Sequence, residues 1–249
     1  MTALEGKTAI VTGGGRDIGR ACAEALAEEG AAVAISYRTS GAGAEEAVEA
    51  ITAKGGRAFA MACNATDQGA VEALVARAVS EFGGVDVLVN NVGGLVARKT
   101  MAELDMDHWA TVMDLNLTSA VFAIKAALPH MAEGGAIVNI ASQAGRDGGG
   151  PGAIAYATAK GAMMTLTRGL AKELGPKIRV NAVCPGMIST GFHDTFTPDE
   201  ARARVAAAVP LKREGRAEEI GKLVAFLASD QAAYVNGASI DANGGALFS

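Results

Sequence analysis

Short apolar runs alternate along the chain with longer, alanine-rich segments in which apolar positions follow a helical period. The short runs are rich in β-branched residues, as buried strands are, and the longer segments have the periodicity of amphipathic helices. The runs predict strands at 7–12, 32–37, 58–63, 85–90, 136–142, 178–184 and 238–242. The longer segments predict helices at 17–29, 43–54, 68–82, 107–132, 154–174, 199–207 and 217–228.

Each predicted strand except the last precedes a predicted helix, an order typical of a parallel sheet with helices on both faces. No low-complexity linker and no repeat divides the chain. The sequence therefore predicts an α/β fold in which residues 1–249 form a single, doubly wound domain around about seven strands. In such sheets ligands bind outside the carboxyl ends of the strands, where strand order reverses, so we expect a site there.

Composition and charge exclude several classes of partner. The chain is 50% apolar, with a net charge of −5 and scattered positive charges, so it has no electrostatic footprint for nucleic acid or an anionic membrane. Charges at Glu5 and Lys7 stand where a signal peptide needs its apolar run, and no stretch approaches a membrane span, which predicts a cytoplasmic protein. The three cysteines and three histidines show no ligand spacing, so we expect buried thiols and no metal.

The segment TGGGRDIGR at 12–20 closes the first predicted strand and opens the first helix. Glycines at such a turn let the backbone approach a pyrophosphate, whose charge is stabilised by the free N–H groups of the helix N-terminus. A tight structural connection would use the same glycines. Its place in the first strand–helix unit favours a nucleotide site.

The segment YATAK places Tyr156 and Lys160 four positions apart, on one face of a predicted helix. Such a pair is also common on ordinary amphipathic surfaces. Here it follows a glycine-rich loop after the strand that ends at Ser142, so all three side chains should lie at the carboxyl edge of the sheet.

Four elements in this order resemble those of the short-chain dehydrogenase/reductase family: TGGGRDIG at 12–19, NNVG at 90–93, YATAK at 156–160 and NAVCPG at 181–186. Together they cover nearly the whole chain. The resemblance implies a Rossmann-type fold, a nicotinamide cofactor and a homotetramer.

The resemblance also implies roles for individual residues. Tyr156 would be the general acid for reduction and the general base for oxidation, with Lys160 lowering the phenol pKa from about 10 and holding the nicotinamide ribose. Ser142 would orient the substrate oxygen, and Asn116 would complete a proton relay. The cofactor-binding residues would be Gly13, Gly15, Arg16, Asp17, Ile18, Gly19, Tyr37, Arg38, Thr39, Ser40, Asn64, Ala65, Asn91, Gly93, Tyr156, Lys160, Pro185, Gly186, Ile188 and Thr190.

The sequence departs from the family pattern at two places. Asp17 stands at the middle glycine of the turn, where a carboxylate should repel the pyrophosphate; we expect it to cap the helix by accepting an N–H near Gly19 or Arg20, and to weaken cofactor binding without abolishing it. Val92 replaces an alanine near the adenosine.

The segment SYRTS at 36–40 bears on the choice of cofactor. No acid ends the second strand, whereas Arg38 and Arg16, with Thr39 and Ser40 as donors, suit a 2′-phosphate. We therefore favour NADP(H) over NAD(H). Asn64 stands where the family has an aspartate that accepts from the adenine amino group.

The substrate region is a predicted mobile lid at about 187–213. The resemblance within the family is greatest to 3-oxoacyl-acyl-carrier-protein reductases, which implies reduction of a small-molecule carbonyl. Glu133 weakens one carrier-docking surface while Lys172 and Lys177 remain near another, so acyl carrier protein stays open as a partner. A general carbonyl reductase, an alcohol or sugar dehydrogenase, and a non-catalytic NADP(H)-binding regulator remain alternatives.

Overall fold

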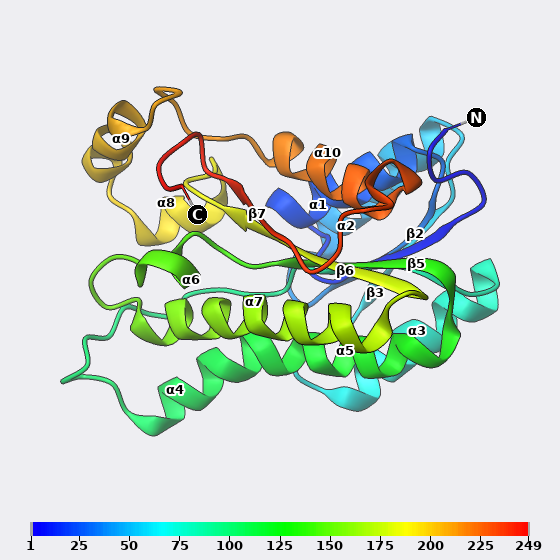
Figure 1. The fold of residues 1–249 in the computed structure, drawn as a ribbon, viewed down its shortest axis with the longest axis horizontal. Helices are drawn as coiled ribbons and strands as arrows, with labels where there is room; N and C mark the ends of the chain where they lie inside the picture. Colours follow the sequence, from blue (N-terminus) through cyan, green and yellow to red (C-terminus); the bar gives the residue numbers. More distant parts are fainter. Residues whose placement is uncertain (1, 249) are drawn as a thin grey trace.

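The computed structural model describes residues 2–248 as one twisted sheet of seven parallel strands between two layers of helices (Figure 1). The strand order is β3-β2-β1-β4-β5-β6-β7. The strands are β1 Thr8–Val11, β2 Ala32–Tyr37, β3 Ala58–Ala62, β4 Val85–Asn90, β5 Met131–Ile140, β6 Ile178–Pro185 and β7 Ser239–Ala242.

Strands β2 and β3 lie on one side of β1, and β4, which pairs in parallel with β1, lies on the other side. Strand order therefore reverses between β1 and β4. Every other neighbouring pair is parallel too, so all seven carboxyl ends lie at one edge of the sheet. The predicted α/β class, strand number and single doubly wound domain are confirmed. The reversal places the predicted ligand crevice beyond β1 and β4.

Helices cover both faces of the sheet, as predicted. Helices α1, α2 and α10 pack on one face, whereas α3, α5 and α7 pack on the other (Figure 1). The helices are α1 Asp17–Glu28, α2 Gly41–Ala53, α3 Gln68–Phe82, α4 Met106–Met113, α5 Ser119–Ala127, α6 Ala144–Asp147, α7 Ile154–Leu174, α8 Gly191–Phe196, α9 Asp199–Ala208 and α10 Ala217–Ala228. A π-turn, η1 Asp114–Thr118, and two short 3₁₀ turns, η2 Leu128–His130 and η3 Asp230–Ala232, complete the list.

Side chains on alternate faces of the central strands feed two hydrophobic layers. Val11 of β1 packs on the α1 side and Ile10 on the α3 side, and both are fully buried. This near-continuous apolar character is what a sheet covered on both faces requires. The sheet is therefore a rigid platform for whatever lies at its edge.

The single predicted helix at 107–132 is wrong in detail. The structure divides it into α4, the π-turn η1, α5 and the 3₁₀ turn η2, and β5 already begins at Met131. The short helices α6 and α8 were not predicted, because one or two turns are too short to show a helical period.

The expectation that no segment approaches a membrane span is also wrong, because one run is long and apolar enough to cross a membrane. The run Met106–His130 has a mean hydropathy of 1.3 in its most apolar window, with 39% of that window buried inside the protein. In the structure it packs against α3 and α7. Its apolar side chains therefore belong in part to the core of this domain.

The three cysteines are free and buried, as predicted. Burial raises the pKa of the Cys22 thiol to about 12. Among residues 2–248 no three metal-ligating side chains gather in one place.

Candidate active site

A cavity of about 860 Å³ opens at the carboxyl edge of the sheet, between the ends of β1, β2, β4, β5 and β6. Segments 187–197 and 205–209 close one side of it. Of the cofactor and catalytic residues predicted from the sequence, all line this cavity except Gly15 and Asn116. Segments far apart in the chain therefore meet at the predicted place.

The glycine turn after β1 has no room for side chains. A Cβ atom at Gly19 would lie 2.2 Å from the carbonyl oxygen of Gly13, and Gly13 itself has a φ of +66°. A Cβ atom at Gly15 would lie 2.4 Å from the Ser40 hydroxyl oxygen, so Gly15 lets the turn pack against the β2–α2 loop instead of lining the cavity. Such a bare backbone beside a helix N-terminus fits a pyrophosphate.

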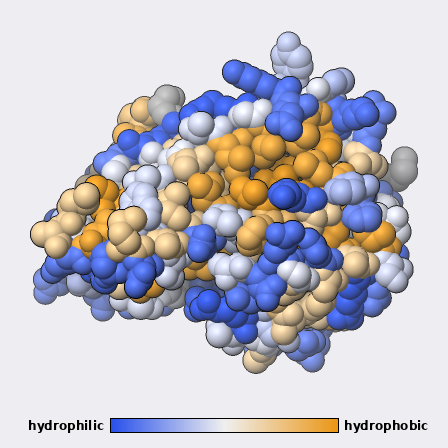
Figure 2. Space-filling view, turned by 90° about the horizontal axis from the view of Figure 1, so that it is seen from below, coloured by the Kyte–Doolittle hydropathy of each residue, from blue (hydrophilic) through white to orange (hydrophobic). Residues whose placement is uncertain are grey.

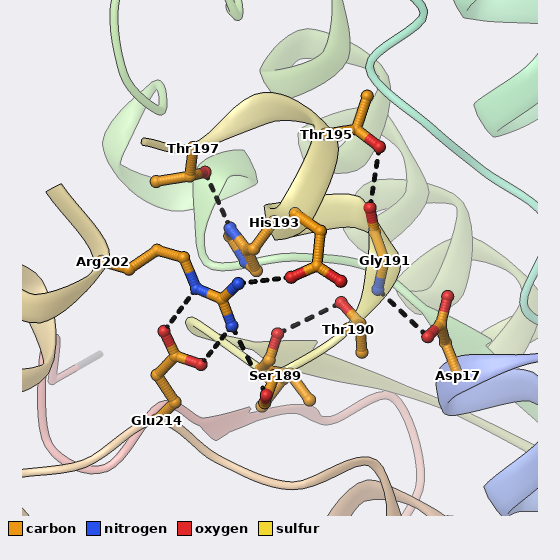
Figure 3. Close-up of polar contacts among 11 residues, drawn as sticks. Asp17, Ser189, Thr190, Gly191, His193, Thr195, Thr197, Arg202 and Glu214 are labelled. Carbon is orange, nitrogen blue, oxygen red and sulfur yellow. Dashed lines mark hydrogen bonds and ion pairs between the residues drawn. The ribbon is translucent and has the colours of Figure 1, made fainter. Parts of the chain in front are cut away.

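Asp17 does not cap α1, so that prediction is wrong. It adopts a φ of +51°, a left-handed conformation that turns its carboxylate away from the helix. One carboxylate oxygen accepts the backbone N–H of Gly191, 174 residues away, at 3.2 Å (Figure 3). The other lies 3.7 Å from Nε of Arg16. Asp17 thus joins the glycine turn to the first residue of α8.

Polar side chains gather where β2 ends. Arg38 is exposed and forms no hydrogen bond or ion pair within residues 2–248, and Thr39 and Ser40 follow it along the cavity. Asn64 also lines the cavity, but its amide oxygen accepts from the N–H and hydroxyl of Thr66 at 3.3 and 3.0 Å. An adenine amino group would therefore share this oxygen with Thr66. The free guanidinium of Arg38 is suited to a phosphate.

Ser142, Tyr156 and Lys160 meet where β5 ends beside the first turns of α7. Tyr156 and Ser142 are hydrogen-bonded through their side chains. Lys160 is 3% exposed, its Nζ donates to the carbonyl oxygen of Ile140 at 2.7 Å, and this Nζ lies 5.8 Å from the centre of the Tyr156 ring. The predicted i, i+4 pair therefore faces the cavity and not the outer surface.

Burial governs the protonation of this pair. Removal from water lowers the pKa of Lys160 to about 8. Burial raises the pKa of the Tyr156 phenol, and the hydrogen bond from Ser142 lowers it by less. The charge of Lys160 is not among the causes of this shift, so the expected lowering of the phenol pKa by Lys160 is not seen in this structure. The phenol stays protonated, ready to donate.

Asn116 lies behind the cavity wall, in the π-turn η1, and is fully buried. Its Nδ2 donates to the carbonyl oxygens of Gly94 and Val112 at 2.8 and 2.9 Å, and its Oδ1 accepts from Gly94 N at 2.9 Å. A Cβ atom at Gly93 would lie 2.6 Å from Asn116 Oδ1 and 2.9 Å from Lys160 Nζ. The absent side chain of Gly93 thus leaves Asn116 and Lys160 next to each other. Single π-turns inside α-helices are frequent at functional sites.

The predicted lid consists of α8 and α9 with their connections. Arg202 of α9 makes two bonds to the Glu214 carboxylate, at 2.8 and 2.7 Å, and also binds Asp194 (Figure 3). Phe192 of α8 packs on Tyr156 with ring centres 5.8 Å apart. Glu214, the residue that holds α9 in place, lies one position beyond the predicted end of the lid.

Several cavity residues were missed from the sequence. Leu95, Val96 and Arg98 follow β4 and line the cavity, as do Gln143 and Asp147 after β5. Their position directly after strands that end at the ligand edge was the available signal.

Comparisons with known proteins agree with this geometry. A family model described as enoyl-(acyl carrier protein) reductase matches residues 13–246. An uncharacterized oxidoreductase of Methylorubrum extorquens is 43% identical over 98% of this chain and 99% of its own. A 3-oxoacyl-[acyl-carrier-protein] reductase of Staphylococcus aureus is 41% identical over 96% of this chain and 97% of its own. Glucose 1-dehydrogenase 2 of Bacillus subtilis is 36% identical, over 97% and 95%.

Solved structures give the same result. A short-chain dehydrogenase/reductase from Serratia marcescens has a TM-score of 0.92 at 38% identity, covering 98% of both chains. A short-chain dehydrogenase from Burkholderia cenocepacia, solved in complex with NADP, has a TM-score of 0.91 at 37% identity, covering 98% of this chain and 99% of that one. With matches of this extent and identity, the chain belongs to the short-chain dehydrogenase/reductase family of oxidoreductases.

Proposed function

We propose that the protein is an NADP(H)-dependent oxidoreductase that reduces a carbonyl group, in a 3-oxoacyl thioester or a similar ketone, to an alcohol. One observation carries the proposal. The protonated phenol of Tyr156 faces a cavity that is also lined by the glycine turn after β1. This phenol is hydrogen-bonded to Ser142 and lies four residues along the chain from the buried cation Lys160.

The cofactor preference rests on charge at the end of β2. Arg38 has no side-chain partner among residues 2–248, and Arg16, in the glycine turn that packs against the β2–α2 loop, has only a 3.7 Å contact with Asp17. Two guanidinium groups suit the additional phosphate of NADP(H), and an acid that would exclude it is missing from this strand end. Binding by the Burkholderia relative, solved with NADP, supports the same choice.

The bound nicotinamide would supply or accept the hydride. Ser142 orients the substrate oxygen, and the Tyr156 hydroxyl donates its proton to that oxygen as negative charge develops. Lys160 would hold the ribose hydroxyls of the bound cofactor and, being close to Asn116, would return a proton to the phenol through a relay behind Gly93. Gly13, Ile18, Gly19, Asn91 and Thr190 are the further residues that would contact the dinucleotide.

Named relatives of this chain act on two kinds of substrate. The Staphylococcus relative is a 3-oxoacyl-[acyl-carrier-protein] reductase, whereas the Bacillus relative is a glucose dehydrogenase, so a sugar or alcohol dehydrogenase is the second candidate. Lys172 and Lys177 are exposed and available to an acidic carrier protein, but Glu133 is exposed as well. A mixed surface of this kind favours a weak carrier interaction or a free small-molecule substrate.

We also propose a homotetramer in the cytoplasm. Figure 2 shows an apolar area on the face covered by α5 and α7. The half-buried apolar residues of η1, α5 and α7 include Leu117, Phe122, Leu166 and Leu170. An apolar surface of this kind is typical of an interface between subunits. Light scattering at micromolar concentration would test the assembly.

The decisive experiment is a screen for turnover with NADPH and NADH against an acetoacetyl thioester, simple ketones, aldehydes and glucose. We expect NADPH-dependent reduction of the thioester or a ketone, and none by Tyr156→Phe. Turnover of glucose with NAD would favour the sugar dehydrogenase. NADPH binding, seen as a fluorescence change, without turnover of any compound would favour a non-catalytic regulator.

A further inference from the structure

The loop after β4 contains a strained turn at the cavity. Val96, a β-branched residue, has a φ of +66°, and the N–H of Ala97 donates to the carbonyl oxygen of Leu95 at 2.8 Å. This is a γ-turn of the rare, strained kind, and its central residue lines the cavity. Such conformations persist only where the surroundings hold them, and they cluster at ligand-clamping segments.

Arg98, two residues further on, supplies contacts that hold this loop. Its Nε and Nη2 both donate to the carbonyl oxygen of Phe196, at 3.2 Å each, and its Nη1 donates to the carbonyl oxygen of Pro151 at 2.9 Å. Phe196 ends α8 of the lid, and Pro151 belongs to the loop before α7. One planar guanidinium group therefore joins the β4 loop, the lid and the loop that precedes the catalytic tyrosine.

Backbone packing supports the same bridge. The N–H of Lys99 donates to the carbonyl oxygen of Gly152 at 3.0 Å, and a Cβ atom at Gly152 would lie 2.9 Å from Cβ of Arg98. The β4 loop thus lies directly against the loop before α7. The β4 loop contacts the lid, by contrast, through the Arg98 side chain.

The bridge leads to the catalytic phenol through two aromatic rings. Phe196 and Phe192 pack with ring centres 5.2 Å apart, and Phe192 packs on Tyr156 at 5.8 Å. Phe192 lies on a helix of six residues with no buried residue of its own, so its position depends on what holds the ends of that helix. Arg98 holds the carboxyl end.

We propose that Arg98 is a positioning residue that fixes the Phe192–Phe196 pair as an aromatic wall beside Tyr156, and that this wall selects ketones with a planar, apolar substituent on the carbonyl carbon. This inference rests on the proposed reductase function and names the substrate class for that site. Aromatic rings favour such a substituent by burial and by offset or edge contacts between rings. A methyl ketone gains little from the same wall.

The test compares two β-ketoesters, ethyl benzoylacetate and ethyl acetoacetate, with NADPH and the variant Arg98→Ala. We expect KM for the phenyl ketone to rise about tenfold, since charge-assisted hydrogen bonds are lost, and KM for the methyl ketone to change less than about threefold. Arg98→Lys should not restore the wild-type KM, because an ammonium group cannot span both carbonyl oxygens. Added methylguanidinium should partly restore Arg98→Ala.

Arg204→Ala is the matched control, because it removes an exposed arginine from the lid itself, and the Arg204 side chain forms no hydrogen bond or ion pair within residues 2–248. Hydrogen exchange of residues 190–208, measured without substrate, should increase in Arg98→Ala and not in Arg204→Ala. Equal losses for both ketones, or unchanged exchange in the lid, would overturn the proposal. If the wild-type protein reduces neither ketone, the proposed reductase function fails, while the exchange data still decide whether Arg98 holds the lid.

Discussion

The two sides of the cavity are held in different ways. On the sheet side, Lys160 is 3% exposed, bonded to the backbone of β5 and carried by a helix packed into the core. On the lid side, the contacts are mostly those of polar side chains near solvent: Asp17 to Gly191, Arg98 to Phe196 and Arg202 to Glu214. The proposed proton-transfer groups are therefore fixed by burial, whereas the proposed substrate side is held by contacts that respond to salt and to single substitutions.

The largest effect is expected when Tyr156, the proposed proton donor on the sheet side of the cavity, is replaced. Tyr156→Phe should lower kcat by about a thousandfold, because a positioned general acid contributes on the order of 10²–10⁴. NADPH binding, measured by fluorescence, should be nearly unchanged, since the ring and its packing on Phe192 remain. A variant that keeps more than a tenth of wild-type turnover would contradict the proposed role.

The second prediction concerns the stability of the buried cation. Burial lowers the pKa of Lys160 from 10.5 to about 8, so between these pH values the unfolded chain holds a proton that the folded chain has released. Stability contributed by this residue therefore rises with pH through that window, and below pH 8 the full desolvation penalty acts against folding.

Lys160→Met removes this penalty. We expect the variant to exceed the wild type in free energy of unfolding by about 3 kcal/mol at pH 7, with the advantage disappearing toward pH 10.5. Urea unfolding at both pH values measures it, and activity should be lost. A difference that does not depend on pH would show that Lys160 is not desolvated.

The third prediction concerns Asp17, which joins the glycine turn to the lid. Asp17→Gly removes a carboxylate and a left-handed, non-glycine residue from the glycine turn, so Kd for NADPH should fall about three- to tenfold. Asp17→Asn is the matched variant, because it keeps an oxygen for Gly191 N–H without the charge. An unchanged Kd in both variants would mean that the carboxylate does not oppose the cofactor.

The smallest expected effect is on the lid alone. Arg202→Gln breaks the pair with Glu214, whose side chains are 16% and 18% exposed, and should raise substrate KM about threefold with little change in kcat. Salt at 0.5 M should raise KM of the wild type in the same direction, and by more than it raises KM of the variant. Equal salt sensitivity in both proteins would show that the Arg202–Glu214 pair does not hold the lid.

The sheet and most of the cavity could be predicted from the sequence, because strands, glycine turns and the Tyr156–Lys160 spacing are local patterns. The contacts of Asp17 and Arg98 could not, since their partners lie 174 and 98 residues away and local sequence gives no sign of them. The direction of the Tyr156 pKa was missed for a related reason. Burial by the surrounding fold, not the neighbouring charge, decides it.

The buried thiols have a use of their own. Cys22 lies in α1, Cys63 follows β3 and Cys184 lies in β6, so they mark separate parts of the fold, and all three have a raised pKa. Alkylating reagents attack the thiolate, which is scarce in the native protein and common in any opened form. Pulsed labelling followed by mass spectrometry would therefore record the order in which helix α1, the end of β3 and strand β6 open.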